Sequence, residues 1–350
     1  MIVKKPRAVD CHSLVRRGPL LWAALICLLA PAAHAGLGLH RIIVLPEVRG
    51  QFGRLALDTA HQRLFVPVTG SDSLLAVDLE KGVISNRLKG LNAPRDTVFL
   101  PDGQVAVSDG GNGAISFHDA ATLQPRGTLI FGSDASALQL DPESGNLYLG
   151  YGRKQQSGIA VIGSDGKLRA QLPMPDHPQG LVLDTRAQRL YVSFAALNGI
   201  AVFDLTDGKL IANWSLGEMA GTNYPLALDA DGKRLFVGGR RGDEIAVLDT
   251  QSGKLLQNIA APGDTDALNF DARNHELYAS GGIGQLAVYV ESADGLLHEL
   301  DRIATRRGAR SGLLDAGSGH YYLAVPASAG KPAEIRIYLV INQPADGEQQ

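Results

Sequence analysis

The sequence has very little cysteine: two residues in 350, Cys11 and Cys27, both near the N-terminus. After Cys27 the chain therefore has no pair of thiols for a disulfide and no Cys-x-x-Cys-His motif for covalent haem. The signatures of zinc proteases, of serine hydrolases with a nucleophile elbow and of phosphate-binding loops are missing as well. The motifs thus indicate no reaction, no metal and no cofactor, and the chain is not expected to be an enzyme.

The first 35 residues have the form of a secretory signal. Five basic residues ending at Arg17 precede an apolar run, 20–30, that is too short for a stable membrane span. Small residues at Ala33 and Ala35 then match the positions that a signal peptidase reads, so we expect cleavage after Ala35. A retained membrane anchor is the alternative.

Removing this segment changes the chemistry of the chain. The product has 28 Lys and Arg against 35 Asp and Glu, a net charge of −7, and no cysteine. We expect a periplasmic or secreted, soluble protein with no membrane span, in which a single domain at 36–342 is followed by a polar tail at 343–350. A fold exported without disulfides must depend on a large core.

One pattern recurs from about Gln51 onward. An apolar stretch ending in Leu-Asp or Phe-Asp is followed by a turn, a strand such as Arg-Leu-Phe-Val, a loop, and Ile-Ala-Val-x-Asp. A repeat of roughly 40–45 residues with four short strands predicts a β-propeller blade. Seven copies predict an all-β, seven-bladed propeller, and they begin near Leu55, Asp96, Ala137, Leu181, Leu226, Ala267 and Ser311.

The seventh copy lacks its fourth strand. An unassigned strand, Ile-Ile-Val-Leu at 42–45, lies at the other end of the chain, and a link of the kind that joins two blades follows it. We therefore predict that the N-terminal strand pairs with 335–339 and completes the last blade. This closure would remove the open edges that invite aggregation.

Acidic and glycine residues mark the turns. An aspartate follows the first strand of six repeats, where we expect its side chain to cap a turn rather than to form a ring of carboxylates. The glycine-rich stretch 109–113 lies between two strands, so a hairpin turn is favoured over a phosphate cradle. The six aspartates are Asp58, Asp141, Asp184, Asp229, Asp271 and Asp315.

The repeats resemble a known family. Arg-Leu-Tyr-Val at 189–192, Ile-Ala-Val-Phe-Asp at 200–204 and Gly-Lys-Leu at 208–210 are similar to the YVTN-type repeat of exported bacterial propellers, as are the matching stretches of blades one and five. The resemblance covers nearly the whole chain after residue 35 and implies an exported seven-bladed propeller. Because its motif residues lie in strands and turns, it implies no catalytic residue. Blades two and three depart from the pattern.

Propeller ligands usually meet the face where the innermost strands begin, around the central channel. The residues just before each innermost strand are mixed in charge and rich in hydrogen-bonding groups, which suits a small polar ligand or a partner loop. The alternative is that loop tips are polar because they face water. Prolines stiffen the loop of the single histidine in this set. The candidate ligand-binding residues are Arg54, Arg95, Asp96, His177, Gln179, Asn223, Tyr224, Asp266 and Arg310.

Three functions compete. The first is a non-catalytic propeller that binds an unknown periplasmic protein or small molecule at the channel mouth. The second is a calcium-dependent, lactonase-like hydrolase, which needs Glu, Asn and Asp around one ion, whereas blade one offers Arg54. The third is an accessory to a quinone or haem system, for which His177 is the nearest to an iron ligand.

The net charge argues against nucleic acid as a partner, and we interpret the basic pairs at 240–241 and 306–307 as solvated loops.

Overall fold

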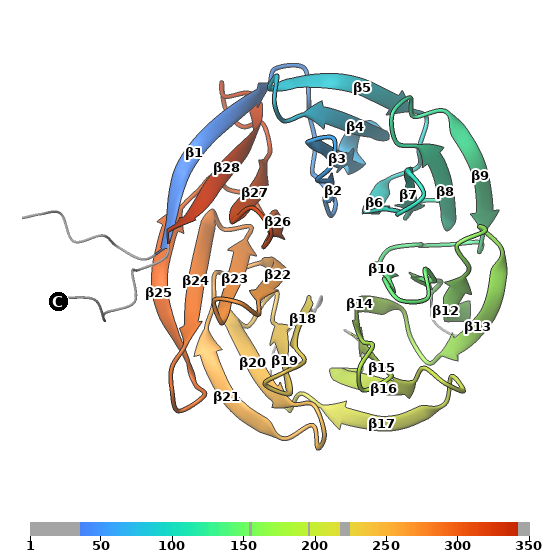
Figure 1. Ribbon diagram of the computed structural model, residues 1–350, viewed down its shortest axis with the longest axis vertical. Coiled ribbons are helices and arrows are strands. Elements are labelled where there is room, and N and C mark those ends of the chain that lie inside the picture. The colour runs from blue at the N-terminus through green and yellow to red at the C-terminus, as the bar shows by residue number, and fades with distance from the viewer. Residues whose placement is uncertain (1–35, 154–155, 195–196, 218–224, 342–350) are drawn as a thin grey trace, which may run out of the picture. The chain divides into compact units, whose positions relative to one another are not determined.

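The computed structural model describes residues 36–153, 156–194, 197–217 and 225–341. Seven four-stranded antiparallel sheets stand in a ring (Figure 1), which confirms the predicted seven-bladed propeller. The predicted signal segment and the predicted polar tail lie outside the described residues. Within the described ranges, no helix has the length and the apolar character that crossing a membrane requires.

Each blade is built outward from an innermost strand, and consecutive strands pair in chain order. Blades one to three consist of β2 (Ala56–Asp58), β3 (Arg63–Val68), β4 (Ser73–Asp78) and β5 (Val83–Lys89); β6 (Pro94–Phe99), β7 (Gln104–Asp109), β8 (Ala114–Asp119) and β9 (Pro125–Ile130); and β10 (Leu138–Leu140), β11 (Leu147–Tyr151), β12 (Ser157–Ile162) and β13 (Leu168–Met174). A single 3-10 turn, η1 (Thr69–Ser71), joins β3 to β4.

The other four blades repeat this plan. They consist of β14 (Pro178–Asp184), β15 (Arg189–Phe194), β16 (Gly199–Asp204) and β17 (Leu210–Ser215); β18 (Leu226–Asp229), β19 (Arg234–Gly238), β20 (Glu244–Asp249) and β21 (Leu255–Ala260); β22 (Thr265–Asp271), β23 (Glu276–Gly281), β24 (Gln285–Glu291) and β25 (Leu297–Ala304); and β26 (Ser311–Asp315), β27 (His320–Val325), β28 (Ala333–Ile341) and β1 (Gly36–Leu45).

The N-terminal strand closes the ring, as the missing fourth strand predicted. β1 lies antiparallel to β28, with Ile43 opposite Ile335 and Leu45 opposite Ala333. The strand is longer than 42–45 because pairing extends back to Gly36 through an irregularity between Leu39 and Arg41. The first and last segments of the propeller therefore share one sheet.

The core is divided among the junctions between blades. The described residues contain seven buried apolar clusters, and each joins two neighbouring blades. In β4, Leu75 and Val77 pack toward blade seven, while Leu74 and Ala76 pack toward blade two. Successive side chains of a strand point to opposite faces, so a sheet covered on both faces needs apolar residues at every position. This explains why the middle strands do not alternate between polar and apolar residues.

The repeated aspartates cap turns, as predicted. The side-chain oxygen of Asp184 accepts a hydrogen bond from the backbone nitrogen of Ala187 at 2.9 Å, and Asp229 accepts one from Gly232 at the same distance. Asp58, Asp141, Asp271 and Asp315 accept equivalent backbone bonds. The stretch 109–113 is the predicted hairpin turn between β7 and β8. These carboxylates therefore hold hairpins together instead of lining the channel.

Candidate ligand-binding site at the channel mouth

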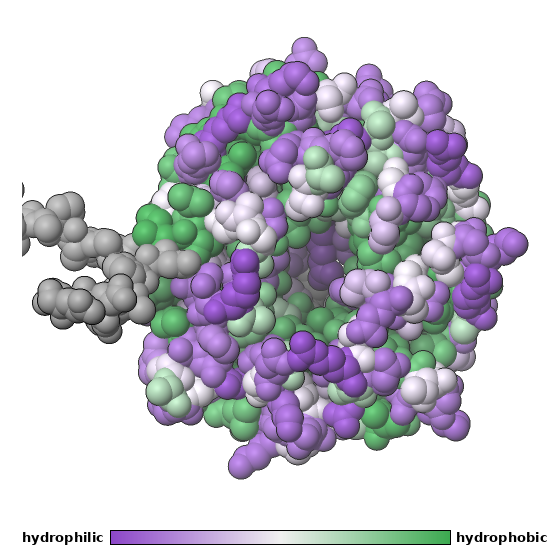
Figure 2. All heavy atoms as spheres, viewed as in Figure 1, coloured by the Kyte–Doolittle hydropathy of each residue, from purple (hydrophilic) through white to green (hydrophobic). Residues whose placement is uncertain are grey.

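The antiparallel topology gathers two kinds of loop on one face of the ring. Each innermost strand begins on this face, and the loop between the second and third strands of each blade returns to it. The space-filling view shows that the ring is hollowed at its centre (Figure 2). A cavity of about 270 Å³ opens at the mouth, and all seven blades or the segments leading into them contribute to its lining. The lining residues are Gln51, Phe52, Gly53, Arg54, Thr69, Arg95, Asp96, Ser136, Ala137, Gln179, Arg240, Asp266 and Arg310.

The predicted residues are distributed unevenly around this cavity. Six of the nine candidates line it: Arg54, Arg95, Asp96, Gln179, Asp266 and Arg310. Asn223 and Tyr224 lie outside the described residues, so the structure places neither of them.

His177 does not line the cavity but connects two blades behind it. Its Nε2 lies 3.0 Å from the hydroxyl of Ser136, and its Nδ1 lies 2.6 Å from the carbonyl oxygen of Gly152. The carbonyl can only accept, so Nδ1 carries a proton and donates it. Both ring nitrogens are occupied by protein partners from blade three. The imidazole therefore anchors the start of β14, and Ser136 rather than His177 faces the mouth.

One wall of the mouth is made by the start of blade two and the segment before blade one. Gly53 allows the two segments to approach closely, because a Cβ there would lie only 2.1 Å from the carbonyl oxygen of Arg95. The backbone nitrogen of Arg54 donates to that same oxygen at 2.9 Å. Two arginines from neighbouring blades consequently stand next to each other at the rim.

Asp96 lies beneath these arginines and is 3% exposed. Its Oδ2 accepts a hydrogen bond from the backbone nitrogen of Leu138 at 2.9 Å and lies 3.5 Å from Nη1 of Arg54. Burial raises the pKa of Asp96 to about 6, because desolvation outweighs the opposing effects of Arg54 and the hydrogen bonds. Its charge is therefore sensitive to pH near neutrality.

The opposite wall carries a network of ion pairs. Nη1 of Arg310 lies 2.9 Å from Asp264, which also accepts a hydrogen bond from Nε of Arg240. Nε of Arg310 lies 3.3 Å from Asp266 in an ion-pair contact without the alignment of a hydrogen bond. Burial lowers the pKa of Arg240, but Asp266 and Asp264 outweigh this effect and raise it overall. Blades five, six and seven are thus connected by ion pairs.

The sequence-based interpretation of the two basic pairs as solvated loops is wrong for Arg240 and Arg306, which both contact other protein groups. Arg240 lines the cavity because it follows β19, whose end returns to the face where β18 begins. Arg306 has a side chain only 12% exposed, pairs with Glu334 at 3.1 Å and donates to two carbonyl oxygens. Arg240 could have been found from its position just after the second strand of blade five, because the second strand of every blade ends at the mouth.

A smaller cavity of about 210 Å³ lies below the mouth and shares Arg54, Asp96 and Asp266 with it. Each of the seven blades contributes an aliphatic residue to its lining, while Thr97, Gln139 and Asn269 add polar groups. The mouth is thus charged and the channel beneath it carries an aliphatic ring. The members of this aliphatic ring are Leu55, Val98, Leu138, Leu181, Leu226, Leu268 and Leu313.

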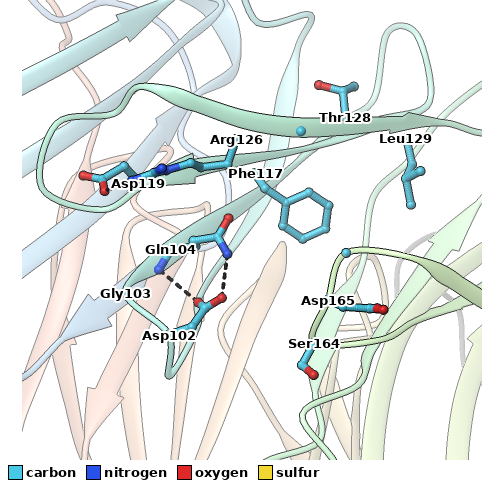
Figure 3. Close-up of a pocket in the computed structure, with 12 residues that line it drawn as sticks. Asp102, Gly103, Gln104, Phe117, Asp119, Arg126, Thr128, Leu129, Ser164 and Asp165 are labelled. Carbon is cyan, nitrogen blue, oxygen red and sulfur yellow. Dashed lines mark hydrogen bonds and ion pairs between the residues drawn. The ribbon is translucent and has the colours of Figure 1, made fainter.

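A larger cavity, about 490 Å³, is a groove between blades two and three at the opposite face (Figure 3). Its carboxylates already have protein partners. Oδ1 of Asp102 accepts a hydrogen bond from the backbone nitrogen of Gln104 at 3.2 Å, and Asp119 pairs with Arg126 at 2.8 Å. Asp165 pairs with an arginine of β13 at 2.8 Å. Only two blades form this groove, whereas all seven converge on the mouth, so the mouth is the better candidate despite its smaller volume.

The described residues contain no group of three or more His, Cys, Asp or Glu side chains placed to hold a metal ion. The carboxylates at the mouth are each close to an arginine, as the distances above show. What the geometry offers is a set of charged and polar groups converging on a small cavity, which is typical of ligand recognition.

Comparisons with known proteins place the fold and nothing finer. No family model matches the sequence, and no curated protein does. Among solved structures, the chain is similar to Kuenenia stuttgartiensis hydrazine synthase, with a TM-score of 0.69 and 16% identity over 80% of this chain and 94% of that chain. It is also similar to a chain in the crystal structure of a mitotic checkpoint complex, with a TM-score of 0.73 and 12% identity over 97% of this chain and 99% of that chain. At these identities the likeness is one of fold alone: the chain is a β-propeller.

Proposed function

We propose that this protein is an exported, non-catalytic binding propeller of the YVTN-repeat type, which works in the periplasm or outside the cell. Its binding surface is the channel mouth, where it takes up a small polar ligand or a group presented by a partner protein. The observation that carries the proposal is the convergence of all seven blades on one cavity lined by charged side chains. A propeller fold is compatible with protein binding, as a propeller chain occurs in the mitotic checkpoint complex.

The groove between blades two and three is the competing location for binding. The mouth is favoured because it has a charged group available to a ligand. The exposed side chain of Arg95 has no carboxylate partner among the described residues, whereas the carboxylates of the groove are already engaged. A charged group without a partner gains most from meeting a ligand of opposite charge.

The test is native mass spectrometry of the full chain purified from the compartment to which it is exported. We expect a non-covalent adduct on the wild-type protein and its loss in Arg95→Glu. The matched control is Lys254→Glu, which reverses an exposed charge in the β20–β21 turn at the opposite face. An adduct that persists in Arg95→Glu but disappears in Lys254→Glu would refute the proposed surface.

A further inference from the structure

The lining of the mouth cavity carries a small excess of positive charge in a chain that is negative overall. The chain has a formal net charge of −3, yet four arginines line the cavity against two aspartates, with Asp264 as a third that pairs with two of these arginines. The excess is one positive charge when every carboxylate is ionised. The groups counted are Arg54, Arg95, Arg240 and Arg310 against Asp96, Asp264 and Asp266. A local field of this sign favours an anion, and its size suits a single negative charge.

The excess charge is located on the wall formed by blades one and two. Arg95 is exposed and forms no ion pair with any described residue, and its side chain lies close to Gly110 from Cγ to Nε. The neighbouring Arg54 is held only loosely, with 3.5 Å between its Nη1 and Asp96. Arginine presents a planar set of donors that matches a carboxylate in a two-pronged contact. This wall therefore offers donors that the protein itself leaves unused.

The aliphatic ring lies directly below these donors. The two cavities share Arg54, Asp96 and Asp266 in their linings. A purely polar anion would occupy the mouth and leave the partly exposed members of the aliphatic ring, Val98, Leu226 and Leu313, uncovered. An anion with an aliphatic chain would pair its head with Arg95 and remove apolar surface of the aliphatic ring from water, which is favourable.

We infer that the ligand of the channel mouth is an aliphatic carboxylate, bound with its acid group on Arg95 and Arg54 and its chain directed into the aliphatic ring. The inference rests on the proposed function and specifies the chemistry of the same site. Two sources provide this chemistry: a free straight-chain acid, or the C-terminal residue of a protein chain that ends in an aliphatic side chain. Both present one negative charge beside an apolar group.

The test measures the binding of sodium octanoate to the full chain by isothermal titration calorimetry. A charge-assisted hydrogen bond is typically strong enough that Arg95→Gln should weaken binding by about tenfold or more. Lengthening the acid from butanoate to octanoate should tighten binding by about fourfold for each methylene that enters the aliphatic ring. Octan-1-ol and octylamine serve as neutral and cationic controls, and Lys254→Gln is the matched variant at the opposite face.

A second titration distinguishes the two sources. A soluble, unstructured peptide ending in leucine is compared with the same peptide amidated at its C-terminus. Binding of octanoate that Arg95→Gln weakens supports a free acid, and binding of the acid peptide alone supports a protein C-terminus. The inference is overturned if octan-1-ol or octylamine binds as tightly as octanoate, if Arg95→Gln has no effect, or if neither probe binds. A neutral or cationic adduct lost in Arg95→Glu would overturn it while leaving the proposed function intact.

Discussion

The two walls of the channel mouth both contain arginine and aspartate, but these residues make different contacts on each wall. On the side of blades five to seven, Arg240 and Arg310 lie within ion-pair reach of aspartates from blade six. On the side of blades one and two, Arg95 has no such partner among the described residues, and Arg54 lies 3.5 Å from Asp96. The first wall connects neighbouring blades, and the second leaves donors directed to the cavity.

This difference follows from what each arrangement costs. Charged groups that are partly removed from water remain stable only when they have partners, so the network of blades five to seven cannot give up a member without penalty. An exposed guanidinium retains its hydration and needs no partner. The wall of blades one and two can therefore change its contacts when a ligand binds. The wall of blades five to seven would lose stabilising ion pairs if it did the same.

The largest effect is expected when the ring that brings the walls together is opened. Deleting residues 36–46 removes β1, which supplies Ile43 and Leu45 to one junction core and Leu37 to another. The closing contact between the hydroxyl of Ser311 and the carbonyl oxygen of Phe52, at 2.9 Å, should be lost with it. We expect no cooperative thermal transition by circular dichroism, while the chain 36–350 unfolds sharply. A sharp transition in the deletion variant would contradict the closure.

A smaller effect on stability is expected from neutralising Asp96, the buried carboxylate in the wall of blades one and two. The pKa of Asp96 is raised to about 6 by burial, so its contribution to stability is complete below pH 3.8 and is lost as pH rises through about 6. A shift of this size corresponds to about 3 kcal/mol. Asp96→Asn should therefore gain about 3 kcal/mol in unfolding free energy relative to wild type between pH 4 and pH 8.

Chemical denaturation at several pH values measures this difference. Asp78→Asn provides the opposite sign, because a hydrogen bond from Lys81 lowers the pKa of Asp78 and its contribution is lost as pH falls. If the stability of Asp96→Asn ran parallel to that of wild type across the whole range, Asp96 would not be the buried acid described here.

The two walls can be compared directly with alanine. Arg310→Ala removes one ion-pair contact each from Asp264 and Asp266 and should lower the free energy of unfolding by about 2 kcal/mol. Arg95→Ala removes an exposed side chain and should change it by no more than about 0.5 kcal/mol. Urea denaturation of both variants measures these changes. Equal losses in the free energy of unfolding would show that the walls do not differ.

The smallest effect is expected from moving Arg95 without removing its charge. A Cβ at Gly110 would lie 2.4 Å from Nε of Arg95, so Gly110→Ala should displace the flexible arginine at little cost in stability. Binding of octanoate should weaken a few-fold. Gly127→Ala is the matched control, because a Cβ at that position meets nothing within 4 Å. Unchanged binding in Gly110→Ala would mean that the position of Arg95 does not matter.

The repeat made most of the fold predictable. Each copy carries its own strand and turn signals, and the missing fourth strand of the last copy could be matched only by the apolar run at 42–45. The pairing of Ile43 with Ile335 confirms that match. The start of β1 at Gly36 was not predicted, because its first residues become a strand only through pairing with β28.

The sequence predicted which residues surround the candidate site, but it did not predict the contacts that they make. Arg95 and Arg310 could be placed at the mouth because each comes just before or at the start of an innermost strand. The burial of Asp96, the contact between Arg240 and Asp264, and the anchoring of His177 on Ser136 depend on side chains from different blades. A repeat pattern gives the register within a blade and carries no information on which side chains of two blades meet.

The most direct test of the binding role is a crystal structure of the protein purified from its native compartment. We predict electron density for a bound molecule at the mouth, with an acidic group on Arg95 and an apolar part reaching Leu138 and Leu226. Density confined to the groove between Asp102 and Asp165, with only water at the mouth, would contradict the account.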